Sequence, residues 1–81
     1  MDWDEFSSLS IDRQLNIAFE KGKYILHKMT DDIILGLFEL GNFYVAIITL
    51  RDTGKVSTVK VFENAEQLDP FLIELENNPL L

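Results

Sequence analysis

The most apolar region of the sequence is centred on residues 42–50, Asn-Phe-Tyr-Val-Ala-Ile-Ile-Thr-Leu. It is rich in aromatic and β-branched residues and carries no charge, which is typical of a buried β-strand. A second apolar run, residues 33–40, lies just before it, and the dipeptide Gly41-Asn42 between them is a two-residue hairpin signal. The sequence therefore predicts an antiparallel hairpin in which Leu40 faces Phe43.

This pairing divides the hairpin into two faces. One face carries the pairs Phe38/Val45, Gly36/Ile47 and Ile34/Thr49, and the other carries Leu37/Ala46, Leu35/Ile48 and Ile33/Leu50. An antiparallel sheet with one solvated face normally alternates between apolar and polar residues, whereas both faces here are apolar. We therefore expect both faces of the hairpin to be covered, either by the chain itself or by a partner.

The next strand is predicted at residues 56–62, after a polar turn at residues 51–55 in which Gly54 suits a positive φ. We expect Val59 and Val61 to share the face of Ile48. Phe62 would then share the face of Val45.

A helix is predicted to begin after Ser10 as N-cap and to end at Lys21-Gly22, with Gly22 at positive φ. Residues 23–29 then read as a strand, followed by a hairpin turn at residues 30–32. The alternative runs the helix through Gly22 to Met29 and leaves three strands.

On the C-terminal side, Asn64 is expected to cap a short helix, with Gln67 three residues later as in a capping box. Pro70 is expected to interrupt that helix and restart a turn. Residues 1–9 read as an arm and residues 77–81 as a tail. The fold expected for this single domain, residues 1–81, is α+β: an N-terminal helix, a four-stranded antiparallel meander and a short C-terminal helix, with the helices on the face of Leu35 and Ile48.

Catalytic and cofactor signatures are absent from the sequence. The 81 residues include no cysteine, so a disulfide, a thiolate zinc site and a cysteine nucleophile are excluded. His27 is the only histidine and has no nucleophile beside it in sequence, and Asp31-Asp32 fits turn chemistry better than a pair of catalytic carboxylates. No phosphate-binding glycine loop or serine elbow occurs. We expect no cofactor, no metal and no enzymatic activity.

The net charge of −7 is unevenly distributed, because all seven Lys and Arg lie between Arg13 and Lys60 and both ends are acidic. This charge balance disfavours binding to nucleic acid and to anionic membranes. It also argues against a double-stranded-RNA-binding domain, whose element order the three-strand alternative would match. The acidic start and the short apolar runs predict a cytoplasmic protein without a secretory signal or membrane span.

We expect the helices to leave one hairpin face uncovered. The leading function hypothesis is that this face binds a second copy in a homodimer or another protein partner. Its predicted residues are Ile34, Phe38, Phe43, Val45, Ile47 and Phe62. The competing interpretation is that the arm or a helix covers this face. A second hypothesis is an acidic inhibitor or immunity-type protein that blocks a basic or nucleic-acid-binding partner.

Overall fold

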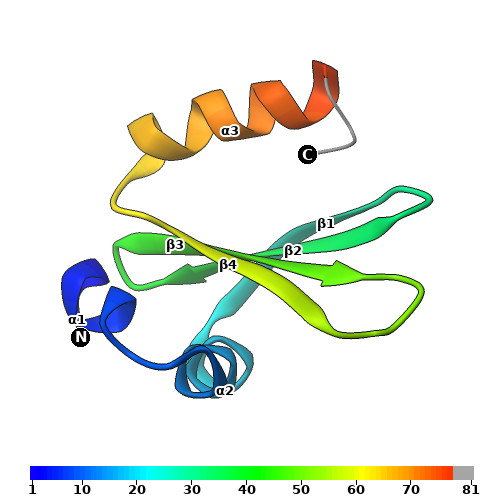
Figure 1. Cartoon of the computed structure of the whole chain (residues 1–81). Helices are drawn as coiled ribbons and strands as arrows, with labels where there is room; N and C mark the ends of the chain where they lie inside the picture. The colour runs from blue at the N-terminus through cyan, green and yellow to red at the C-terminus, as the bar shows by residue number, and fades with distance from the viewer. Residues whose placement is uncertain (78–81) are drawn as a thin grey trace.

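The computed structural model describes residues 1–77, with side chains through Glu74, and has an α+β fold. The elements in order are α1 (Trp3–Ser7), α2 (Ile11–Lys21), β1 (Lys23–Met29), β2 (Ile33–Leu40), β3 (Phe43–Leu50), β4 (Val56–Phe62) and α3 (Ala65–Asn77). The strands form one antiparallel sheet in the order β1-β2-β3-β4, with α3 on one face and α1 and α2 on the other (Figure 1). The four-stranded meander is confirmed, and the three-strand alternative is wrong. Of the predicted tail, Asn77 ends α3 and residues 78–81 lie outside the described residues.

The central hairpin has the register that the sequence predicts. Leu40 pairs with Phe43, Phe38 with Val45, and the pairing continues to Ile33 and Leu50. Gly41 has a φ of 65° and Asn42 does not have a positive φ, which is the pattern of a type II′ turn. The turn and the strand alternation together fix both faces of β2 and β3.

The predicted faces of β4 are wrong. Thr49 pairs with Val56, but Ile48 pairs with Thr58, so β4 contains one extra residue at this point. Because successive side chains point to opposite faces, a shift of one residue reverses every position beyond it. Val59 and Val61 therefore lie opposite Ile47 and Val45, and Phe62 lies on the other face of the sheet.

Helices pack on both faces of the sheet, which corrects the expectation that all of them lie on the face of Leu35 and Ile48. On one face Leu68 and Phe71 of α3 pack with Leu35, Leu37, Ala46 and Ile48. On the other face Phe6 of α1 and Ala18 of α2 pack with Leu40, Phe43, Val45 and Ile47. The arm predicted for residues 1–9 thus contains a helix, and its Phe6 ring lies 5.5 Å from the Phe43 ring inside the chain's own core.

Helix α3 continues through Pro70, although the sequence predicted an interruption there. Its start is as predicted, since the Asn64 side chain accepts a hydrogen bond from the Gln67 backbone N–H at 3.0 Å. A proline lacks the N–H that would bond to the carbonyl four residues earlier, and its ring crowds that carbonyl. Leu68 and Phe71, on either side of Pro70, are both buried against the sheet. Tertiary packing therefore holds the two halves of α3 in line.

Helix α2 begins after Ser10 and ends at Gly22, as predicted. The conformation that was expected to end it is not the one observed. Gly22 has φ −75° and ψ 146°, an extended conformation, so the predicted positive φ is wrong. A Cβ on Gly22 would lie 2.4 Å from the Ala18 carbonyl oxygen and 3.2 Å from the Phe38 Cβ. Glycine is needed here because the chain turns into β1 in close contact with α2 and β2.

We predict that Gly22→Ala destabilises the protein. The added methyl group must displace the Ala18 carbonyl, and overpacking of this kind costs about 1–3 kcal/mol. The measurement is the midpoint of urea unfolding. The matched control is Asn16→Ala at an exposed position of α2, which should leave the midpoint unchanged or raise it slightly. A Gly22→Ala midpoint at or above that of the wild type would contradict the close approach.

Candidate interaction surface

Helices α1 and α2 cover only one end of their face of the sheet. Strands β2 and β3 have eight residues each, and eight residues span roughly 26 Å at 3.3 Å per residue, whereas a helix is about 10–12 Å across. Leu40 and Phe43, beside the β2–β3 turn, are buried beneath the helices, whereas Ile34 and Thr49 at the opposite end are only half-buried. We call the uncovered area the open face, made of Phe19, Tyr24, His27, Met29, Ile34, Gly36, Phe38 and Thr49.

A hollow of about 280 Å³ lies in the open face. Gly36 is among its lining residues, and the Phe38 ring lies 3.3 Å from the point that a Cβ on Gly36 would occupy. The side chains of α2, β1, β2 and β3 around it are Phe19, Tyr24, His27, Ile34, Phe38, Ile47 and Thr49. None of these is acidic, so the hollow is an apolar depression with polar atoms only from His27, Tyr24 and Thr49.

Three aromatic rings stand together beside the hollow. The Phe19 and Phe38 ring centroids are 5.6 Å apart at an interplanar angle of 81°, and those of Tyr24 and Phe38 are 5.9 Å apart at 75°. Edge-to-face pairs of this kind are worth about 0.5–1.5 kcal/mol beyond their buried area, so they hold the rings in place. The Tyr24 hydroxyl and His27 Nδ1 share a hydrogen bond. Phe19 nevertheless remains 62% exposed and Tyr24 52% exposed.

The structure separates the six residues predicted as an interface. Phe43, Val45 and Ile47 are at most 4% exposed within the chain's own core. Phe62 lies on the opposite face, where its ring is 4.9 Å from that of Phe71. Ile34 and Phe38 belong to the open face, and the buried Ile47 also lines its hollow.

Sequence reasoning missed Phe19, Tyr24 and Met29. Phe19 was visible as the residue four positions after Leu15, on the flank of the helical stripe. Met29 lies opposite Ile34 beside the β1–β2 turn, whereas the face of Tyr24, opposite Phe38, depends on an irregularity at Ile25 in the β1–β2 pairing. That irregularity has no signal in the sequence.

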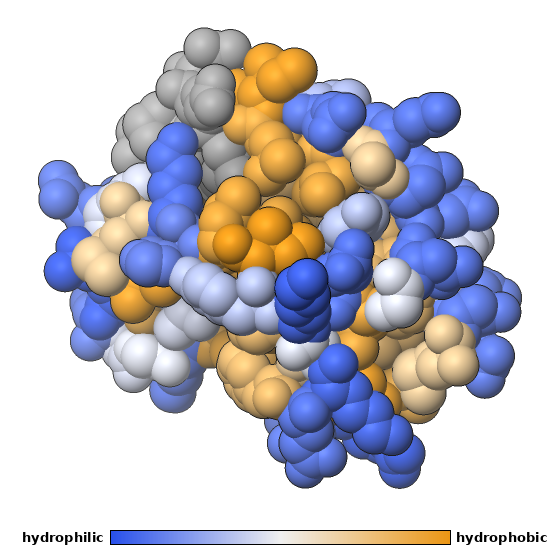
Figure 2. All heavy atoms as spheres, turned by 180° about the vertical axis from the view of Figure 1, so that it is seen from behind, coloured by the Kyte–Doolittle hydropathy of each residue, from blue (hydrophilic) through white to orange (hydrophobic). Residues whose placement is uncertain are grey.

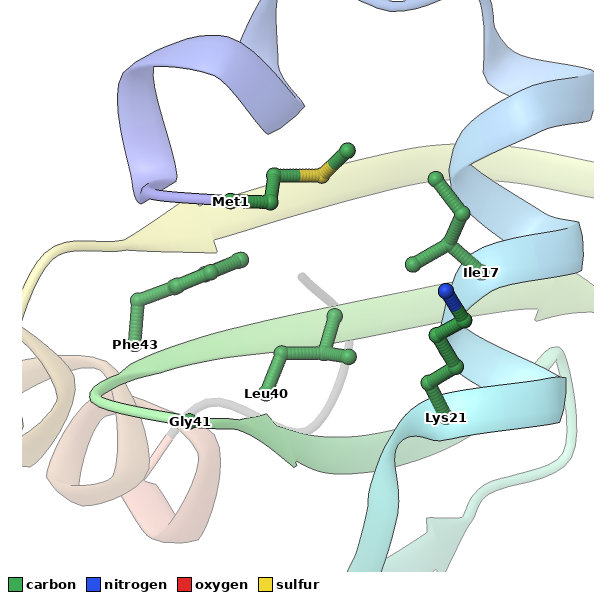
Figure 3. Close-up of a pocket in the computed structure, with 6 residues that line it drawn as sticks. All are labelled: Met1, Ile17, Lys21, Leu40, Gly41 and Phe43. Carbon is green, nitrogen blue, oxygen red and sulfur yellow. The ribbon is translucent and has the colours of Figure 1, made fainter.

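A second pocket, of about 310 Å³, lies between the helices and the β2–β3 turn. Figure 3 shows Met1, Ile17 and Lys21 on one side of it and Leu40, Gly41 and Phe43 on the other. Its only charged side chain is Lys21, in the last turn of α2, where a cation suits the helix dipole. The described lining includes no carboxylate, imidazole or hydroxyl side chain beside the Lys21 amine.

A third depression, of about 520 Å³, runs between α3 and strands β1 and β2. It is lined by Leu26, Leu37, Leu68 and Leu72, with both Tyr24 and Tyr44, and by Lys23, Glu39 and Asp69. Figure 2, which views the molecule from behind, shows an apolar band that descends from α3 at the top and is flanked by hydrophilic surface. Several residues that line this depression, such as Leu37 and Leu68, therefore also belong to the core beneath α3.

His27 lines the hollow in the open face, whereas Asp31 and Asp32 line a separate small pocket with Asp52. Asp31 and Asp32 are in the β1–β2 turn, where the Thr30 hydroxyl accepts hydrogen bonds from the backbone N–H groups of Asp32 and Ile33 at 3.3 and 3.1 Å. Among residues 1–77, whose side chains are described through Glu74, no three described His, Asp or Glu side chains are grouped to hold a metal ion. Within the same range, no helix combines the length and the apolar character that crossing a membrane requires.

Comparison of this chain with protein-family models, curated proteins and solved structures found no match. The geometry of the open face is therefore the basis for assigning a function.

We predict that Phe19 contributes little to folding. Because its ring is 62% exposed, Phe19→Ser should lower the free energy of unfolding by only about 1–2 kcal/mol, from the lost ring pair with Phe38 and the small buried area. Phe6→Ala, at a residue with no exposed surface, should cost about 3–5 kcal/mol. Urea unfolding of dilute protein measures both. A Phe19→Ser cost close to that of Phe6→Ala would show that Phe19 is a core residue.

Proposed function

We propose that this protein is a non-enzymatic interaction protein that self-associates through the open face. The observation that supports this proposal is the exposed aromatic cluster of Phe19, Tyr24 and Phe38 around an apolar hollow. Elsewhere α3 packs over the core on one face of the sheet, and α1 and α2 pack over the end of the other face beside the β2–β3 turn. A monomer rarely leaves a contiguous apolar patch of several hundred Å² in water.

The charge distribution supports an apolar contact at this face. The residues of the open face include no Asp, Glu, Lys or Arg, although the whole chain carries a net charge of −7. Charged residues are depleted at the core of protein interfaces, and a polar rim is typical. Asp12, Glu20 and Lys23, which are close in sequence to Phe19 and Tyr24, are exposed and suit such a rim.

The acidic-inhibitor hypothesis is the second candidate. The first turn of α1 contains Asp4 and Glu5, and the first turn of α3 contains Glu66. A partner with a basic surface would be attracted to these helix ends. Such binding depends on long-range charge and weakens as salt rises, whereas self-association through the open face does not need charge.

We predict that Phe19→Ser shifts the protein toward monomer. Multi-angle light scattering from about 1 to 100 µM covers the range expected for a small interface. The wild type should show an average mass that rises with concentration above 9.4 kDa. Phe19→Ser should remain at the monomer mass.

The matched control for this experiment is Ile73→Ser. Ile73 is also an exposed apolar residue on a helix, but it lies on α3, away from the open face. This variant should associate as the wild type does. Wild-type protein that stays at the monomer mass throughout would refute self-association, and equal loss in both variants would place the contact elsewhere.

We predict that added salt strengthens the association. Two copies of net charge −7 repel each other, and raising the ionic strength from about 0.05 to 1 M shortens the Debye length to roughly 3 Å. The apolar contact itself survives this change. Light scattering at one protein concentration and increasing sodium chloride should show a rising average mass. A fall in mass with salt would favour a charge-driven contact instead.

A further inference from the structure

We infer that two copies of this chain meet about a two-fold axis beside Phe19, so that Phe19 of each copy completes the hollow of the other. This inference rests on the proposed self-association and specifies its geometry. It makes each hollow a composite site with one aromatic ring from the partner copy.

A two-fold contact uses the same patch on both copies, so the patch must contain both a projection and a matching depression. The open face has both in contact. Phe19 projects from the flank of α2, and the same residue forms one wall of the hollow over Gly36. An axis that passes beside Phe19 therefore brings the two Phe19 rings and the two hollows together in a single step.

The hollow has room for the incoming ring. Its volume is about 280 Å³, whereas a dry apolar cavity of ~150 Å³ already binds benzene. A ring entering it meets the Phe38 and Tyr24 rings, and aromatic pairs prefer such tilted or edge-to-face contacts. The absence of acidic residues from the described lining leaves no unpaired carboxylate to bury there.

The available area fits a second copy that binds reversibly. The exposed parts of the open face amount to about 500 Å² per copy if an aromatic side chain is taken as roughly 150–250 Å². Two copies would bury about 1,000 Å² in total, which is at the lower end for specific interfaces and typical of transient ones. This area supports a dissociation constant in the micromolar range or weaker.

Strand pairing between two copies of β1 is the competing arrangement, because β1 is an edge of the sheet. Two features oppose it. The irregularity at Ile25 distorts the strand, and Lys23 places a charge on its exposed edge. Bulges and lysines are devices by which proteins keep edge strands from pairing.

The chain contains no cysteine, so single introduced cysteines can map the contact without background. The probes are Asn16→Cys, one turn before Phe19 on the same flank of α2, and His27→Cys, which lines the hollow. Thr49→Cys is a second probe of the hollow, for the case in which the loss of the Tyr24–His27 hydrogen bond disturbs β1. Ile25→Cys reports strand pairing, and Ile73→Cys on α3 is the control.

Equal amounts of an isotope-labelled Asn16→Cys protein and an unlabelled His27→Cys protein are mixed and oxidised, and mass spectrometry follows the mixed disulfide. Contact within a dimer gives an effective thiol concentration near millimolar, so at about 10 µM protein this disulfide should form on the order of 100-fold faster than any with position 73. The same acceleration is expected with Thr49→Cys.

The outcomes separate the inference from the function on which it rests. Mixed disulfides at positions 27 and 49 that form no faster than the control, in protein that light scattering shows to be dimeric, would overturn the geometry and leave self-association intact. If the disulfide between two Ile25→Cys copies forms fastest, the dimer contact is strand pairing through β1. Protein that is monomeric at every concentration would refute both.

Discussion

The fold depends on one constraint, which is that the β2–β3 hairpin is apolar on both faces and must be covered twice. The chain outside the sheet supplies α3, with 13 residues, for one face and α2, with 11 residues, together with the five-residue α1 for the other. Helix α3 buries Leu35, Leu37 and Ala46 almost completely. On the second face α1 and α2 pack at the end beside the β2–β3 turn, and the open face is what they leave uncovered.

The hairpin could be predicted because the information that fixes it is local. A two-residue turn at Gly41-Asn42 leaves one register, and strict alternation then assigns every side chain to a face. Local signals also predicted the position of β1, the Ser10 and Asn64 caps, and the turn at residues 30–32. Strand β4 could not be predicted in this way, since its extra residue is accommodated by a bulge that no residue type announces. That bulge moved Phe62 from the predicted interface to the core beneath α3.

Two further differences show where tertiary structure overrides local preference. Gly22 was expected to take a left-handed conformation, but it is extended and is required because Ala18 and Phe38 leave no space for a side chain. Pro70 was expected to end a helix, but Leu68 and Phe71 are both held by the sheet, and α3 continues. The sequence located the end of α2 correctly but not its cause, whereas the interruption predicted at Pro70 does not occur because packing against the sheet keeps α3 continuous.

The candidate site was predictable only in the part that β2 contributes. Ile34 and Phe38 follow from strand alternation, whereas Phe19 joins them only because α2 crosses the sheet at Phe38. The same placement explains why association at this face should be weak and reversible. If two copies associate there as proposed, about 500 Å² of exposed surface per copy is opposed by a net charge of −7 on each, so the proposed association is expected to respond to concentration and to ionic strength.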